Sequence, residues 1–150
     1  MGKINGARVI LGGLIAGLII NIFEFVLNGV VLEKEMTAAA SALGRQMGVA
    51  QLAMFMAWGF LTGIFAVWLY AAIRPRYGAG PKTAVTAGFA VWCLGYLLSA
   101  VTPLALKLYP PSIIAILLVV GLIEVIAATL AGAKIYREEG AAQSRTAAAA

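Results

Sequence analysis

Four polar side chains lie inside otherwise apolar stretches of this sequence, and they are the residues best suited to chemistry. Asn21, Glu24 and Asn28 belong to one apolar run, and Glu124 lies near the middle of another. A charged side chain at the centre of a bilayer costs about 2.5–3.5 kcal/mol on insertion scales, so such residues typically mark proton or ion sites. We therefore treat these four residues as a candidate intramembrane polar site.

The same residues also fit a purely structural role, and the sequence leaves both readings open. Neutral glutamate and asparagine side chains can form hydrogen bonds between membrane helices, each contributing about 0.6 kcal/mol on average. Burial disfavours the charged form of a carboxyl group, and no Lys or Arg lies near either glutamate along the sequence. We therefore expect at least one of Glu24 and Glu124 to be protonated at neutral pH, whether or not the two share one site.

The elements that carry these side chains are four long apolar runs. A helix needs about 20 mostly apolar residues to cross the hydrocarbon core of a bilayer. The runs cover residues 9–32, 49–73, 83–106 and 113–135. They predict an all-α integral membrane protein, a single four-helix bundle over residues 1–136, followed by a flexible polar and alanine-rich tail over 137–150. The first run exceeds the roughly 7–15 apolar residues of a signal peptide, so we expect it to be retained.

Basic residues gather beside one set of run ends. Lys3, Arg8, Arg74, Arg76, Lys82, Lys134, Arg137 and Arg145 fall on one predicted side, and Lys34, Arg45 and Lys107 fall on the other. Lys and Arg are enriched in the cytoplasmic loops of membrane proteins. This pattern predicts that both termini are cytoplasmic and that the chain is a multi-pass protein of the cell (inner) membrane.

Small residues recur on one face of each run. Successive helical residues turn by about 100°, which places Gly13, Gly17, Asn21, Glu24 and Asn28 within a sector of roughly 80°. Glycine lets a neighbouring helix backbone approach closely in lipid. We predict that helix packing is carried by Gly13, Gly17, Gly59, Gly63, Gly88, Gly95, Gly121 and Gly132.

Composition removes several classes of function. Hydrophobic residues make up 63% of the 150 residues and charged residues 11%, against about 45–50% and about 25% in soluble domains. The sequence has no His or Asp and one Cys, so histidine-based zinc sites, Ser-His-Asp chemistry and an intrachain disulfide are excluded. We expect no metal site, no cofactor, no enzymatic activity and no nucleic-acid partner, because the net charge of +5 arises from the run ends.

One segment of the first run carries a resemblance. The stretch from Gly12 through Gly13 and Gly17, followed by Asn21-Ile-Phe-Glu24-Phe and Leu27-Asn28-Gly29, resembles the opening of small uncharacterised bacterial four-helix integral membrane proteins. That resemblance implies the helical plan and no activity. The chain is also similar to small multidrug resistance transporters in having four predicted helices and a glutamate in the first. It departs from them in its length, in Glu124 and in its second and third helices.

Two functions follow as expectations. The first is a non-enzymatic structural or accessory subunit that packs through its Gly/Ala-rich faces, with membrane lipid and either a second copy or a larger membrane complex as partners. The alternative is a proton- or cation-coupled transporter of a small molecule. In that case Glu24 exchanges a proton for the substrate, Asn21 and Asn28 orient the Glu24 side chain, and Glu124 tunes the pKa of Glu24.

Overall fold

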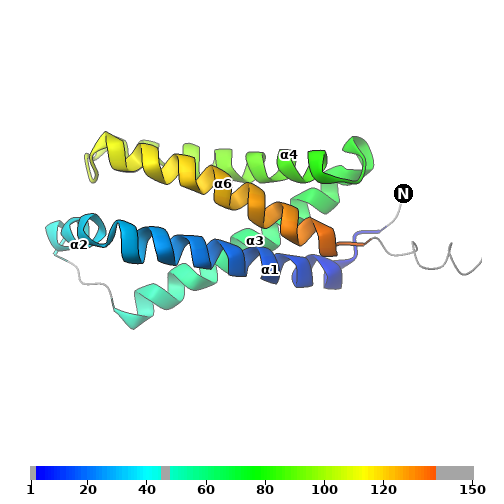
Figure 1. Ribbon diagram of the computed structural model, residues 1–150, viewed down its shortest axis with the longest axis horizontal. Coiled ribbons are helices and arrows are strands. Elements are labelled where there is room, and N and C mark those ends of the chain that lie inside the picture. The colour runs from blue at the N-terminus through cyan, green and yellow to red at the C-terminus, as the bar shows by residue number, and fades with distance from the viewer. Residues whose placement is uncertain (1–2, 45–47, 138–150) are drawn as a thin grey trace, which may run out of the picture.

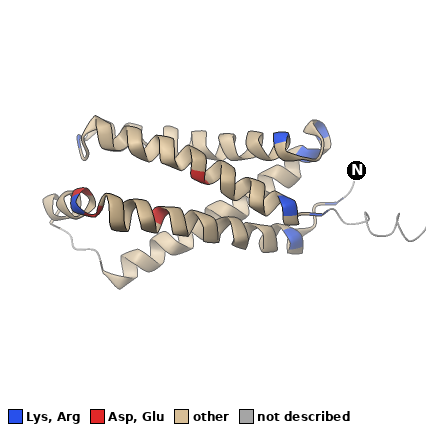
Figure 2. Ribbon diagram, in the orientation of Figure 1, with Lys and Arg blue, Asp and Glu red and all other residues tan. Residues whose placement is uncertain are grey.

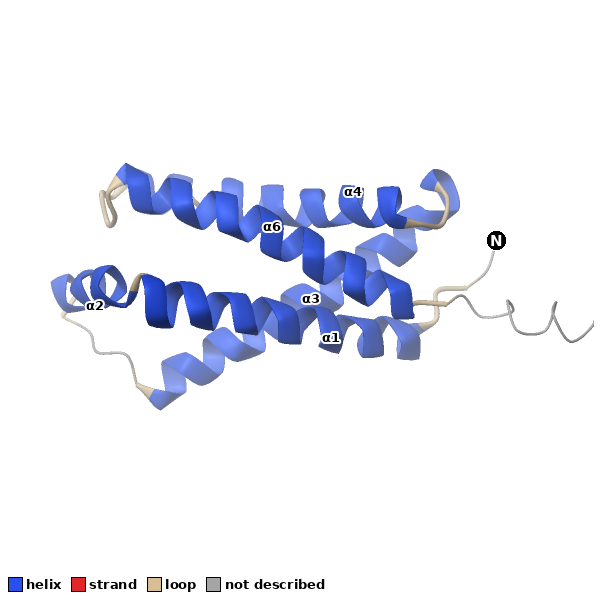
Figure 3. Cartoon of the chain, viewed as in Figure 1, coloured by secondary structure: helices blue, strands red, loops and turns tan. Residues whose placement is uncertain are grey.

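The first part of the chain forms one long helix that ends in a π-helical turn. The computed structural model describes residues 3–44 and 48–137, and within these it contains helices and turns but no strand (Figure 3). Helix α1 covers Gly6–Val26 and continues into the π-helical turn η1, Leu27–Val31, before the short helix α2, Glu33–Ala42. The Asn5 side chain accepts a hydrogen bond from the Arg8 backbone N–H at 3.1 Å, which caps the start of α1.

Three further helical segments follow. They comprise α3 (Val49–Tyr77), then α4 (Pro81–Trp92) with the π-helical turn η2 (Cys93–Leu97) and the short α5 (Val101–Ala105), and finally α6 (Pro111–Ile135). Four segments are long and apolar enough to cross a membrane: Gly6–Val31, Val49–Tyr77, Pro81–Ala105 and Pro111–Ile135. The tail assigned from sequence to residues 137–150 lies, except for Arg137, outside the described residues.

Two details of these segments differ from the sequence-based expectation. Helix α3 continues about one turn beyond residue 73 and ends at Gly78, whose φ of 85° suits glycine and stops the helix. The third run, expected as one stretch over residues 83–106, is interrupted by the π-helical turn η2. Pro103 sits in the first turn of α5, where its missing N–H removes no helical hydrogen bond, and the segment ends two residues later at Ala105.

The helices pack most closely toward the end that holds both described chain ends. Helix α1 packs on α3 and α6, and α4 packs on α6 and α3, while α3 runs obliquely behind the others (Figure 1). Lys and Arg gather at this same end (Figure 2). Away from it, α1 and α6 diverge in the view of Figure 1.

Alanines make up a large part of the interior, and many of the large apolar side chains lie outside. Ala16, Ala66, Ala87 and Ala128 are fully buried. By contrast, an exposed apolar stripe runs along α1 at helical spacing, formed by Ile10, Leu14, Leu18, Ile22 and Phe25. This distribution is the reverse of that in water-soluble domains, where large apolar residues are the most often buried.

The first third of α3 is exposed, and its hydrogen bond to another helix is the one that the Met56 carbonyl accepts from Asn21 of α1. Every residue from Val49 to Trp58 is exposed, and burial begins at Gly59. Met54 and Trp58 are 72% and 69% exposed. Consequently α3 covers the N-terminal and middle parts of α1 but not its C-terminal end. This difference determines what the polar residues of α1 can contact.

Candidate functional site

Three side chains from three helical segments meet at one point between α1, η2 and α6. The Tyr96 hydroxyl lies 2.9 Å from Oε1 of Glu124 and 3.2 Å from Oε1 of Glu24. The two carboxyl groups, which the sequence placed at nearby depth without deciding whether they meet, are thus joined through one phenol. We call Glu24, Tyr96 and Glu124 the carboxyl–tyrosine cluster.

Glu24 is held from its own helix by Asn28. The Asn28 side-chain amide donates a hydrogen bond to Oε2 of Glu24 from one turn further along the chain. Asn28 lies in η1, so the π-helical turn begins directly after the helical turn that carries Glu24. This hydrogen bond fixes the orientation of the Glu24 carboxyl group from within its own segment.

Glu124 is more deeply buried than Glu24, and one of its carboxyl oxygens lacks a hydrogen-bond partner among the described residues. It is 0% exposed and is among the largest side chains that are fully buried. Its Oε1 reaches Tyr96, but its Oε2 is buried with no hydrogen-bond partner among the described residues. A buried polar atom without a partner costs about 1–3 kcal/mol, and such atoms in native proteins call for a specific explanation.

Tyr96 reaches both carboxyl groups because α6 has a glycine beneath its ring. A Cβ on Gly121 would lie 2.5 Å from Cδ1 and 2.6 Å from Cε1 of Tyr96, so any larger residue would displace the ring. Tyr96 itself belongs to η2. One helical turn earlier, the Trp92 indole donates to the Leu118 carbonyl at 2.9 Å, which ties the start of η2 to α6.

The proton count in the cluster determines its chemistry. The Tyr96 hydroxyl has one proton, so it can donate to only one of the two carboxyl groups at a time. If both were ionised, one carboxylate would face the phenol oxygen without a proton between them. A proton on Glu124, donated to the Tyr96 oxygen while Tyr96 donates to Glu24, gives every short contact a hydrogen. The cluster is therefore arranged to hold at least one proton beyond that of the phenol.

Both π-helical turns of the described chain contribute a residue to this arrangement. Asn28 comes from η1 and Tyr96 from η2, on two different membrane-length segments. Isolated π-helical turns inside α-helices are rare and occur frequently at functional sites. Their coincidence here distinguishes this region from the regular helix contacts elsewhere in the protein.

Asn21 does not belong to the cluster, although the sequence grouped it with Glu24 and Asn28. Its side-chain amide donates to the Gly17 carbonyl at 2.8 Å and to the Met56 carbonyl of α3 at 3.2 Å. A Cβ on Gly59 would lie 2.7 Å from Nδ2 of Asn21, so Asn21 fills the space above that glycine. Asn21 therefore joins α1 to α3, and its hydrogen bonds among the described residues do not include one to Glu24.

Most of the glycines assigned to packing lie at close helix contacts. Gly13, Gly17 and Gly63 leave no room for a Cβ between α1 and α3, and Gly132 leaves none between α6 and both α1 and α3. Gly88 is more open, with Thr129 Oγ1 at 3.1 Å from a built Cβ. Gly95 is the exception: a Cβ there meets nothing within 4 Å, because this residue is on the exposed side of η2.

Two residues were missed by sequence reasoning. Gly12 was not counted among the packing glycines, yet a Cβ on it would lie 2.6 Å from the Gly132 carbonyl oxygen. Tyr96 was overlooked, although the sequence contains a signal for it. It lies well inside the run 83–106, whereas the other tyrosines lie near run ends, where membrane interfaces favour them.

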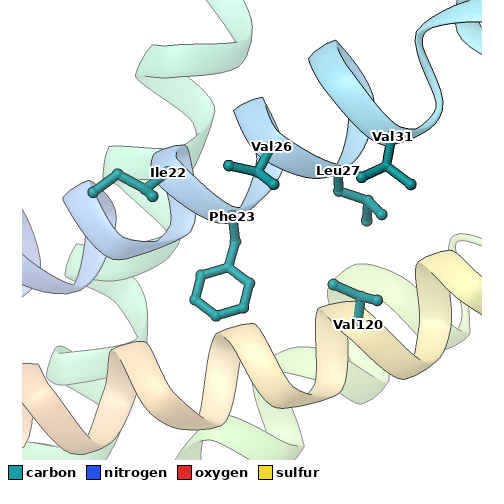
Figure 4. Close-up of a pocket in the computed structure, with 6 residues that line it drawn as sticks. All are labelled: Ile22, Phe23, Val26, Leu27, Val31 and Val120. Carbon is teal, nitrogen blue, oxygen red and sulfur yellow. The ribbon is translucent and has the colours of Figure 1, made fainter.

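An apolar groove opens beside the cluster, between α1 and α6. It has a volume of about 310 Å³, near the lower limit of about 300 Å³ for ligand pockets. Figure 4 shows Phe23 and Leu27 of the α1–η1 segment facing Val120 of α6 across this space. Its lining is entirely apolar and consists of Ile22, Phe23, Val26, Leu27, Val31 and Val120.

No cluster of three or more His, Cys, Asp or Glu side chains occurs among residues 3–44 and 48–137, so a metal site built from such ligands is not seen there. Comparisons with protein-family models, with curated proteins and with solved structures find no match to this chain. The resemblance noted in the first run therefore adds no family, and the site has to be interpreted from its own geometry.

Proposed function

We propose that this chain is a multi-pass membrane protein and a proton-coupled transporter of a small molecule. The observation that carries the proposal is the Tyr96 hydroxyl lying within hydrogen-bond distance of both Glu24 and Glu124. Ionisable residues at membrane depth commonly form the proton relays of pumps and transporters. In this proposal Glu124 holds the exchangeable proton, and the Tyr96 hydroxyl connects the two carboxyl groups by hydrogen bonds.

The membrane setting of the proposal rests on length, composition and charge. Four segments are long and apolar enough to span, and their large apolar side chains point outward. We propose that both termini are cytoplasmic, because Lys and Arg gather at the end that holds the described chain ends. The cell (inner) membrane is part of the same proposal.

The groove beside the cluster supports the transport part of the proposal. It lies next to Glu24 along the chain, since Phe23 and Leu27 flank that residue. We infer that the apolar part of a solute rests in this groove, and that transport requires its polar group to contact the nearby carboxyl groups. Binding of such a solute to the carboxylate form competes with the proton, which is how one site couples the two.

Infrared spectroscopy of the purified full chain tests the proton site. We expect a protonated carboxyl band at neutral pH that disappears on alkalinisation. The band should be diminished in Glu124→Gln and unchanged in Glu33→Gln, a matched control on the exposed first turn of α2. Absence of a protonated carboxyl band at pH 7 would rule the proposed site out.

Transport is tested in proteoliposomes that carry a pH-sensitive dye. Small solutes added outside are screened for proton movement that requires the protein. Proton movement should fall at least tenfold in Glu24→Gln and Glu124→Gln and stay unchanged in Glu33→Gln. Solute flux that survives both cluster variants would contradict coupling through these residues.

A second candidate is the non-enzymatic accessory subunit, and one observation favours it. Residues 49–55 of α3, before the contact of Met56 with Asn21, are all exposed, which leaves a free and largely apolar helix end for a partner or a second copy. The interlocked glycines do not favour it, because nearly all are used inside this chain. Native mass spectrometry in mild detergent decides: a monomer without a copurifying partner counts against this role.

A further inference from the structure

We propose that the carboxyl–tyrosine cluster binds a small monovalent cation, of the sodium class, in exchange for its proton. This inference rests on the proposed proton site and names what competes with the proton there. It is carried by Oε2 of Glu124, a fully buried carboxyl oxygen that has no hydrogen-bond partner among the described residues although its own carboxyl group takes part in the cluster.

The charges of the cluster require a cation or a second proton. With the phenol neutral, two ionised carboxyl groups have a charge of −2, and one added proton leaves −1. In the described part of the chain the basic side chains lie toward the ends of the spans rather than at the cluster (Figure 2). A net charge at this depth is costly, so the neutral states are the favoured ones.

Two neutral states are available, and they differ by one exchange. In the first, both carboxyl groups are protonated. In the second, one carboxyl group keeps its proton, and a monovalent cation replaces the proton of the other carboxyl group. Passing between them releases one proton for each cation bound, and the total charge of the cluster stays the same. An electroneutral exchange of this kind does not have to move net charge into a low-dielectric site.

The oxygen atoms present suit a monovalent ion better than a divalent one. The cluster offers two carboxyl groups, one phenol and the neighbouring Asn28 amide, with the phenol oxygen 2.9 and 3.2 Å from the nearest carboxyl oxygens. Calcium takes about six to eight oxygen ligands, and magnesium demands near-ideal octahedral geometry and usually keeps several waters. A monovalent ion needs less charge compensation, and Glu124 Oε2 has no hydrogen-bond partner among the described residues that such an ion would have to displace.

The test measures proton release and the carboxyl band on the full chain in detergent. NaCl is added at constant ionic strength against choline chloride, whose cation is too large for the site, in weak buffer with a pH dye. We expect sodium to release about one proton per protein and to diminish the protonated carboxyl band. Glu124→Gln should weaken the sodium response at least tenfold, and Glu24→Gln should weaken it as well. Glu33→Gln should respond as the unaltered protein does.

The outcomes separate this inference from the proton site. A carboxyl band that titrates with pH but does not respond to sodium overturns the cation inference and leaves the proton site standing. Equal responses to sodium and choline, or a sodium response retained in both cluster variants, overturn it too. A band that titrates with neither pH nor sodium removes the proton site itself. Circular dichroism of each variant confirms that the helices are intact before these comparisons are made.

Discussion

Gly12 of α1 and Gly132 of α6 meet backbone to backbone. A Cβ on Gly12 would lie 2.6 Å from the Gly132 carbonyl oxygen, and a Cβ on Gly132 would lie 2.7 Å from the Gly12 carbonyl oxygen. The reciprocal contact fixes the point at which α1 and α6 cross. Because both neighbours are backbone atoms, neither can move aside as a flexible side chain would. This crossing sets the spacing at which Glu24 and Glu124 face each other further along the two helices.

Substitution at this crossing should destabilise the protein. We expect Gly12→Ala to lower the free energy of unfolding by about 1–3 kcal/mol, the usual range for overpacking. Gly6→Ala is the matched control, because a Cβ on Gly6 meets nothing within 4 Å. Unfolding in mixed detergent micelles measures both. Equal stability of the two variants would show that α1 and α6 do not cross as closely as described.

Displacing the Tyr96 ring should disturb the cluster without touching a carboxyl group. We expect Gly121→Ala to push the ring away from α6 and to change the carboxyl region of the infrared spectrum. Gly95→Ala, one residue before Tyr96, should leave that region unchanged, because its Cβ meets nothing within 4 Å. Identical spectra for Gly121→Ala and the unaltered protein would contradict the placement of Tyr96.

The two asparagines of the first segment should behave differently. Asn21→Ala removes the hydrogen bond to the Met56 carbonyl and should cost about 0.6 kcal/mol, and at most about 1.7 kcal/mol, with unchanged carboxyl bands. Asn28→Ala removes the donor to Glu24 and should alter the carboxylate band of that residue. Infrared spectra and unfolding measurements on the pair check this. A carboxyl change in Asn21→Ala would return Asn21 to the cluster.

Lipid exposure should differ between two tryptophans. Trp58 is 69% exposed on the free part of α3, whereas Trp92 is partly buried and donates to the Leu118 carbonyl. In proteoliposomes with brominated lipid, a variant that keeps only Trp58 should be quenched more strongly than one that keeps only Trp92. Stronger quenching of Trp92 would mean that the exposed part of α3 is covered by protein, as the accessory-subunit candidate requires.

The sequence by itself determined the four apolar segments, because their length and composition leave few alternatives to membrane-length helices. It also located the deep carboxyl groups and most of the close-packing glycines, since both are visible as residue types at helical spacing. It could not assign neighbours within one helix face. Asn21 and Glu24 share a sector of α1, yet Asn21 contacts α3 and Glu24 contacts η2.

Only the tertiary structure shows that Asn21 and Glu24 contact different helices. The spacing of residues along one helix does not reveal which neighbouring helix lies beside each of them. Helix α3 diverges from α1 beyond the contact between Asn21 and Met56. Glu24, which lies further along the polar face of α1, therefore meets η2 and α6 instead. The π-helical turns also alter the rotation per residue, which a uniform 100° step assumes to be constant. Tyr96 joins two distant glutamates only because helix crossing angles bring η2, α1 and α6 to one point, and those angles depend on all the contacts at once.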